Sequence, residues 1–127
     1  MNSSARGVRS HSAGSEVIVV LLGLLLTACA QNPDIRMGDD NTSGTTAKSP
    51  PAYLGCVKGE LPAHAKTYMQ EDNNSIKLFL DSTDPNQAGG LVEVRNTGKD
   101  RQFSAYQRDA WYDHGRLLEA ALMCSRA

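Results

Sequence analysis

The spacing of apolar residues divides the chain into three parts. Residues 17–26 form one run of valine, isoleucine and leucine that only Gly23 interrupts. Residues 30–51 are polar, with Ile35 and Met37 as their only large apolar side chains. After residue 51 apolar and polar positions alternate in short stretches, and near the C-terminus the spacing becomes helical. The chain is therefore expected to fold only in its C-terminal part.

Alternation in this C-terminal part predicts a small antiparallel meander of about four to five strands. The clearest strand places Ile76, Leu78 and Leu80 on one face and Lys77 and Phe79 on the other. Acidic and amide side chains at 71–74 and a glycine within 96–99 suit hairpin turns. The expected strands cover residues 53–61, 65–71, 75–80, 91–96 and 101–107.

The last segment is predicted to be a helix that Asp109 caps and that runs to about Cys124. Apolar residues recur there at helical spacing, and Trp111, Leu118 and Leu122 are expected to pack on the sheet. The predicted fold class is α+β, with this helix laid across one face of the meander.

The N-terminal apolar run has the properties of an export signal. It follows a polar segment that carries Arg6 and Arg9. Ten helical residues rise only about 15 Å, half of a hydrocarbon core of about 30 Å. The run is therefore too short for a permanent span but long enough to engage export machinery.

The run ends in Leu26, Thr27, Ala28 and Cys29, and this tetrad resembles the lipobox of bacterial lipoproteins. The resemblance implies cleavage after residue 28, a diacylglycerol thioether on Cys29 and acylation of the new amino terminus. Two or more acyl chains hold a protein stably at a bilayer. Because Ala30 rather than aspartate follows the cysteine, the resemblance favours the periplasmic face of the outer membrane over the inner membrane.

Residues 29–50 are expected to be the lipidated end and a flexible linker, and residues 51–127 the folded periplasmic domain. The linker offers too little apolar surface to offset the entropy of ordering it. Its typical span would be roughly 25 Å, and it could stretch to about 70 Å. The domain would then stand clear of the lipid headgroups.

Cys56 and Cys124 are the cysteines that remain once Cys29 carries lipid. In an oxidising compartment, paired thiols tend to form a disulfide. The alternatives are two free thiols or a redox site, but a redox site favours a close Cys-x-x-Cys pair. A disulfide closing this long loop would contribute about 4 kcal/mol in the chain-entropy model.

Composition and motifs argue against several function classes. Removing Arg6, Arg9 and Glu16 with the signal leaves eleven basic and thirteen acidic residues, whereas a nucleic-acid binder needs a basic patch. No motif predicts a catalytic, metal or cofactor site. His64 and His114 are expected at the surface or at caps, although a fold could still bring either one beside an acid.

Three residues form the candidate partner-binding site. Arg108, Tyr112 and Arg116 follow one another at intervals of four, which would align them as an exposed stripe on the predicted helix. The sequence thus favours a non-enzymatic envelope lipoprotein that binds a protein or peptidoglycan. The alternative is an inhibitor of a cell-wall hydrolase, although the signature loop of the membrane-bound lysozyme inhibitors has no counterpart here.

Overall fold

The computed structural model describes residues 32–97 and 100–126. The predicted signal peptide and Cys29 lie outside the described residues. From Pro33 onward the chain forms one compact unit. Among the described residues, no helix combines the length and the apolar character that crossing a membrane requires.

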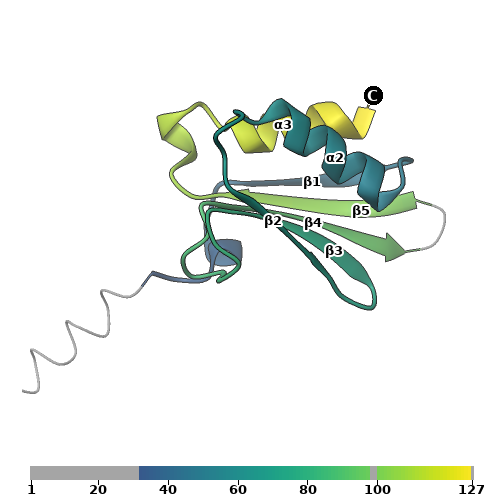
Figure 1. Cartoon of the computed structure of the whole chain (residues 1–127), viewed down its shortest axis with the longest axis horizontal. Coiled ribbons are helices and arrows are strands. Elements are labelled where there is room, and N and C mark those ends of the chain that lie inside the picture. The colour runs from purple at the N-terminus through teal and green to yellow at the C-terminus, as the bar shows by residue number, and fades with distance from the viewer. Residues whose placement is uncertain (1–31, 98–99, 127) are drawn as a thin grey trace, which may run out of the picture. The chain divides into compact units, whose positions relative to one another are not determined.

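The unit is a five-stranded antiparallel sheet with two α-helices on one face (Figure 1), which confirms the α+β prediction. Strands β2 to β5 form the predicted meander, and β1 pairs with β5, so that the spatial order is β1-β5-β4-β3-β2. The elements are η1 (Ile35–Met37), β1 (Asn41–Thr46), α2 (Pro50–Glu60), β2 (Thr67–Glu71), β3 (Ser75–Leu80), β4 (Gly90–Thr97), β5 (Asp100–Gln107), η2 (Ala110–Tyr112) and α3 (Arg116–Arg126).

The main core lies between the sheet and the helices. Alternation places Leu78, Val92 and Val94 on this face, as the sequence predicts, and all three are fully buried. The same core holds the predicted inward pair Phe103 and Ala105 of β5. The two helices complete this core with Tyr53, Leu54, Val57, Leu117, Ala120, Ala121 and Cys124.

A second, smaller cluster lies on the opposite face of the sheet. Phe79 and Leu91 pair across β3 and β4 and are buried there, together with Ile35 of η1 and Ala88 of the loop before β4. Glu93, which the alternation places on this outward face, is only 6% exposed and bonds Arg95 at 3.0 Å. The outward face is therefore partly covered.

The flexible linker predicted for residues 29–50 is wrong for most of its length. Ile35 is buried, and β1 pairs with β5 residue by residue over Asn41–Thr46. The strand consists of short polar residues, so its stabilisation comes from the backbone ladder rather than from large side chains. Gly44 also lies under the ring of Phe103, where a Cβ would be only 3.0 Å from a ring carbon.

The strand predicted over residues 53–61 is also wrong, because this segment forms the helix α2. Ser49 caps it by accepting a hydrogen bond from the Ala52 amide at 3.4 Å, and Pro50 stands in the first turn, where no amide donor is needed. Tyr53, Leu54 and Val57 face the core, and this spacing fits a helix as well as a short strand.

The C-terminal helix is present but starts later than predicted. Asp109 adopts a left-handed conformation with φ 54° and makes no side-chain cap hydrogen bond, and α3 begins only at Arg116. Trp111, predicted to be buried, is 76% exposed. Leu117 takes the buried position in its place, whereas Leu118 and Leu122 pack against the edge of the core.

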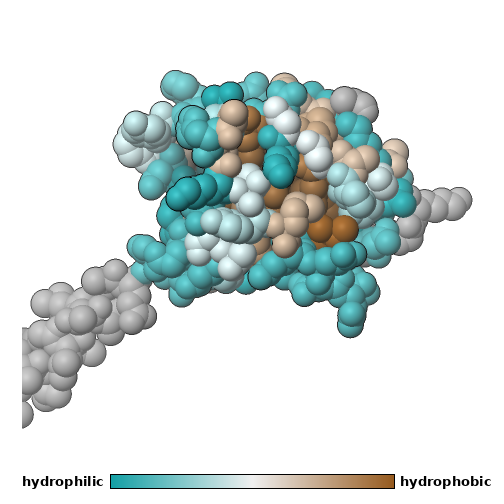
Figure 2. Space-filling model, viewed as in Figure 1, coloured by the Kyte–Doolittle hydropathy of each residue, from teal (hydrophilic) through white to brown (hydrophobic). Residues whose placement is uncertain are grey.

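The predicted disulfide between Cys56 and Cys124 is confirmed, with the two Cα atoms 5.8 Å apart. It joins α2 to α3 rather than a strand to a helix. The two helices leave part of the sheet less covered: Ile76 and Leu80 of β3 remain half-buried. Figure 2 shows apolar surface between α2 and the edge of the sheet formed by β3 and β2.

Candidate functional site

Two adjoining depressions at one end of the sheet, with volumes of about 640 and 530 Å³, form the candidate site. We call them together the sheet-end hollow. The end of β3, the start of β4, the end of β5 and the start of α3 meet here. Both depressions are lined by Leu80, Asp81, Gly89, Gln107, Tyr112 and Asp113. The larger one extends to His64, Lys66 and Arg116, and the smaller one to Arg108, Asp109 and Trp111.

Gln107, at the end of β5, connects the sheet to α3. Its Nε2 donates to Asp113 Oδ1 at 2.7 Å, and its Oε1 accepts from the Leu117 amide at 3.0 Å. Asp113 Oδ1 also accepts from the Arg116 amide at 3.2 Å. Free amide groups at the first turn of a helix need such acceptors. One amide side chain and one carboxylate thus hold both ends of segment 108–115.

The segment 108–115 turns sharply between these ends and presents two aromatic rings to solvent. Asp109, His114 and Gly115 have positive φ angles of 54°, 60° and 70°. The Gly115 amide donates to the Ala110 carbonyl at 2.8 Å, which closes the turn. Trp111 and Tyr112 project from it, 76% and 80% exposed, with their rings edge to face and centroids 5.9 Å apart. The backbone therefore holds an aromatic pair in water at the rim of the hollow.

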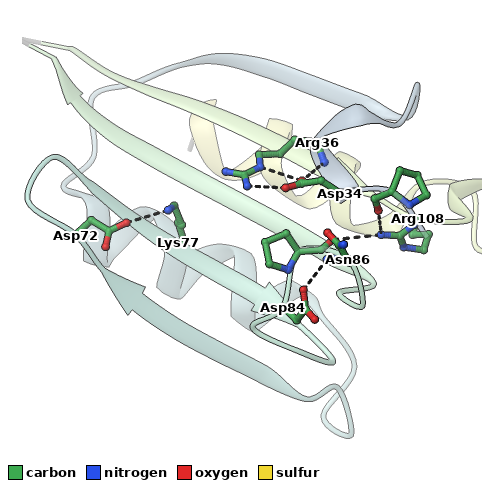
Figure 3. A network of polar contacts seen from close by, with 9 residues as sticks. Asp34, Arg36, Asp72, Lys77, Asp84, Asn86 and Arg108 are labelled. Atoms are coloured by element: carbon green, nitrogen blue, oxygen red, sulfur yellow. Dashed lines mark hydrogen bonds and ion pairs between the residues drawn. The ribbon is translucent and has the colours of Figure 1, made fainter. Parts of the chain in front are cut away.

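Arg108 connects three segments of the chain beneath this turn. Its Nε donates to the Ala88 carbonyl at 3.1 Å, and its Nη2 donates to the carbonyls of Pro33 at 3.1 Å and Pro85 at 3.3 Å. Figure 3 shows this guanidinium reaching into the loop that also contains Asp84 and Asn86. Most of the donors of Arg108 are therefore occupied within the protein.

The structure brings the three predicted partner-binding residues to one hollow, but not as a stripe on one helix. Arg108 follows β5, Tyr112 ends η2, and Arg116 begins α3. Tyr112 and Arg116 are exposed, whereas Arg108 has a structural role. Sequence reasoning missed Trp111, because helical spacing placed it in the core. The left-handed Asp109 before it is the feature that exposes it.

The charges around the hollow are balanced. Lys66, Arg108 and Arg116 line it on the basic side, and Asp81, Asp109 and Asp113 on the acidic side. No single sign dominates, so the hollow offers little net attraction to a highly charged ligand. Exposed indole and phenol rings instead favour a partner with apolar and hydrogen-bonding groups together.

His64 lines the hollow. Within the described residues, neither His64 nor His114 forms a hydrogen bond with a carboxylate. His114 is exposed on the turn. The same part of the chain contains no group of three or more histidine, cysteine or acidic side chains placed to hold a metal ion.

No protein-family model, curated protein or solved structure matches this chain.

Proposed function

We propose that the protein is a lipid-anchored lipoprotein of the bacterial envelope whose domain binds another envelope component without changing it chemically. The anchor is Cys29, in the outer membrane facing the periplasm. The binding surface is the sheet-end hollow with its aromatic rim, Trp111 and Tyr112. Residues 1–28 are the export signal in this proposal.

Two observations support export and anchoring. The Leu26–Cys29 tetrad directly follows an apolar run of the length of a signal sequence. The disulfide between Cys56 and Cys124 is of the kind that persists in exported proteins, since cytosolic reductants keep most thiols reduced.

The observation that carries the binding role is the exposure of Trp111 and Tyr112. A small domain normally buries large aromatic rings, and tryptophan, tyrosine and arginine dominate binding hot spots. Here a fixed turn holds two such rings out of the core, beside a hollow of several hundred Å³. The proposal assigns no bond-making step to this hollow, because Gln107, Asp113 and Arg108 are already committed to hydrogen bonds within the protein.

The anchor is tested by mass spectrometry of the protein purified from its native membranes. The expected amino terminus is Cys29 carrying diacylglycerol, and Cys29→Ser should leave the chain unlipidated. An intact residue 1, or an unmodified sulfur at position 29, would refute the anchor.

The binding surface is tested by photocrosslinking in cells, with a photoreactive amino acid at Tyr112. Thr45 is the matched control, because it is exposed on β1 near the opposite end of the sheet. Position 112 should give a crosslinked product, with protein, peptidoglycan or lipid, that position 45 does not give, and Trp111→Ala should reduce this product several-fold. Identical products from both positions would contradict the proposal.

Inhibition of a cell-wall hydrolase is the second candidate, favoured by the fixed, projecting turn that carries Trp111. Such a turn could fill the substrate cleft of an enzyme. This function predicts inhibition of lysozyme-type hydrolysis by the purified protein, lost in the Trp111→Ala variant. Our leading proposal predicts that the variant and the parent protein leave the hydrolysis rate unchanged.

A further inference from the structure

The folded domain begins much closer to the predicted lipid than the sequence suggests. Pro33 is already held by Arg108, and Ile35 is buried in the second core cluster. Only Ala30, Gln31 and Asn32 separate Cys29 from Pro33. Four Cα–Cα steps span at most about 14 Å. A lipid on Cys29 therefore keeps Pro33 within that distance of the lipid headgroups.

The end of the sheet that contains Pro33 is also the end that contains the aromatic turn. Arg108 bonds Pro33 and precedes Trp111 by three residues, so the Cα atoms of Arg108 and Trp111 lie at most about 11 Å apart. Figure 1 shows η1, which lies close to the start of the described chain, and the turn before α3 at the same end of the sheet. The short connection at Pro33 thus brings this end toward the membrane.

The most exposed large apolar side chains gather at this end. Met37, Trp111 and Tyr112 are 77%, 76% and 80% exposed, the highest values among the described large hydrophobic residues. Met37 follows Pro33 by four residues, and the two rings follow Arg108 by three and four. The same hydrogen bond between Arg108 and Pro33 therefore anchors both segments that carry exposed apolar groups.

We propose that the partner of this aromatic end is the surface of the bilayer that carries the Cys29 lipid, with Trp111 and Tyr112 in the headgroup region. This inference rests on the proposed function and names the partner of its binding surface. Indole and phenol rings favour the membrane interface, where the ring meets apolar chains and its polar tip meets water.

The balance of charge around the hollow indicates which lipid property matters. Lys66, Arg108 and Arg116 are matched by Asp81, Asp109 and Asp113. Anionic lipid attracts a surface in proportion to its excess of basic residues. We therefore expect contact to depend on the anchor and the aromatic rings, and to change little with the fraction of anionic lipid.

The test uses the fluorescence of Trp111, which is the only tryptophan of the chain. The full lipidated protein from native membranes is reconstituted in vesicles of phosphatidylethanolamine with 10% or about 30% phosphatidylglycerol. At both compositions Trp111 emission should shift to shorter wavelength, and spin-labelled lipid should quench it. Acrylamide quenching of Trp111 should be several-fold weaker in the vesicles than for the same protein in aqueous solution without vesicles or detergent.

The matched control moves the reporter to the other end of the sheet. Asn74 is exposed in the turn between β2 and β3, six residues before Leu80 and therefore about 20 Å from it along the strand direction. In the Trp111→Phe/Asn74→Trp variant, acrylamide should quench the new tryptophan freely and spin-labelled lipid should not. Equal lipid quenching at both positions, or free acrylamide quenching of Trp111, would overturn the inference.

Mass spectrometry of the same preparation separates this failure from a failure of the proposed function. If Cys29 carries lipid and Trp111 still reports an aqueous environment, the bilayer contact is wrong while the anchored binding module stands. If Cys29 carries no lipid, the proposed anchoring itself is wrong. A protein crosslinked at Tyr112 with Trp111 in water would assign the surface to a protein partner instead.

Discussion

The hydroxyl of Tyr53 in α2 donates a 2.7 Å hydrogen bond to the carbonyl of Ala121 in α3, and both residues are fully buried. The Tyr53 ring also lies against Phe103 of β5, with centroids 5.2 Å apart. One side chain thus links the two helices to each other and to the sheet. The two residues of this hydrogen bond are separated by 68 positions in the sequence, as are the two cysteines of the disulfide between the same helices.

Tyr53→Phe is expected to lower the free energy of unfolding by about 1–2 kcal/mol at neutral pH, because it removes a buried hydrogen bond. Burial raises the pKa of Tyr53 above its ordinary value. Tyr53 therefore stays protonated to higher pH in the folded state than in the unfolded state. Its contribution to the free energy of unfolding is fully present below about pH 10 and declines above it. Urea titrations from pH 7 to pH 11 should show a smaller alkaline decline in Tyr53→Phe than in the parent. If Tyr68→Phe reduces the alkaline decline in the free energy of unfolding as much as Tyr53→Phe does, the buried hydroxyl of Tyr53 is not its cause.

The disulfide is expected to supply much of the stability of this small domain. Cys56→Ala/Cys124→Ala should lower the free energy of unfolding by about 4 kcal/mol, because the unfolded chain regains the entropy of an open loop. A reducing agent should shift the urea midpoint of the parent protein toward that of the double variant. The double variant itself should not respond to the reductant, and a response there would point to another cause.

Ile35 tests whether the segment before β1 belongs to the fold. Ile35→Ala should cost about 2–4 kcal/mol, since it leaves a cavity beside Phe79 and Leu91. Met37→Ala, two residues away and 77% exposed, should change stability little. Urea denaturation measures both variants. Equal stability of the two variants would restore the interpretation of this segment as a flexible linker.

Asp34 is expected to titrate at unusually low pH. The side chain of Arg36 donates hydrogen bonds to its carboxylate, and the Arg36 amide adds another, so that the pKa of Asp34 falls to about 2. A lowered pKa contributes stability above the unfolded value, about 3.9, and this contribution is lost as the pH falls toward 2. An NMR titration of the Asp34 carboxyl should give a midpoint near 2, and Arg36→Gln should raise it. Because both groups are partly exposed, salt should weaken the effect.

The central strands could be predicted from the sequence because their pattern reflects their surroundings. In β3, β4 and β5 every second residue faces the helices and is buried. Apolar residues therefore recur with a period of two in the sequence of these strands. Leu78, Val92 and Phe103 follow this rule. The disulfide was predictable for a different reason, because the expected export to an oxidising compartment and the number of remaining cysteines left few choices.

The edge strand and the first helix could not be predicted in the same way. β1 contains only short side chains, and its partner β5 lies more than fifty residues away in sequence. Asn41, for example, pairs with Tyr106. The ladder between them leaves no periodic signal in a polar segment. In α2, the apolar positions 53, 54 and 57 satisfy both a helix and a short strand, and two glycines weaken the local preference for a helix.

The sequence by itself determined an α+β domain with an antiparallel meander, a C-terminal helix and a pair of cysteines that would join. The tertiary structure decided where the domain begins, that residues 50–60 are helical, and that Trp111 faces solvent. These features depend on contacts between distant segments, such as Arg108 with Pro33 and Gln107 with Asp113 and Leu117. Local periodicity records only whether a side chain is buried in its own element, so it carries no information about such contacts.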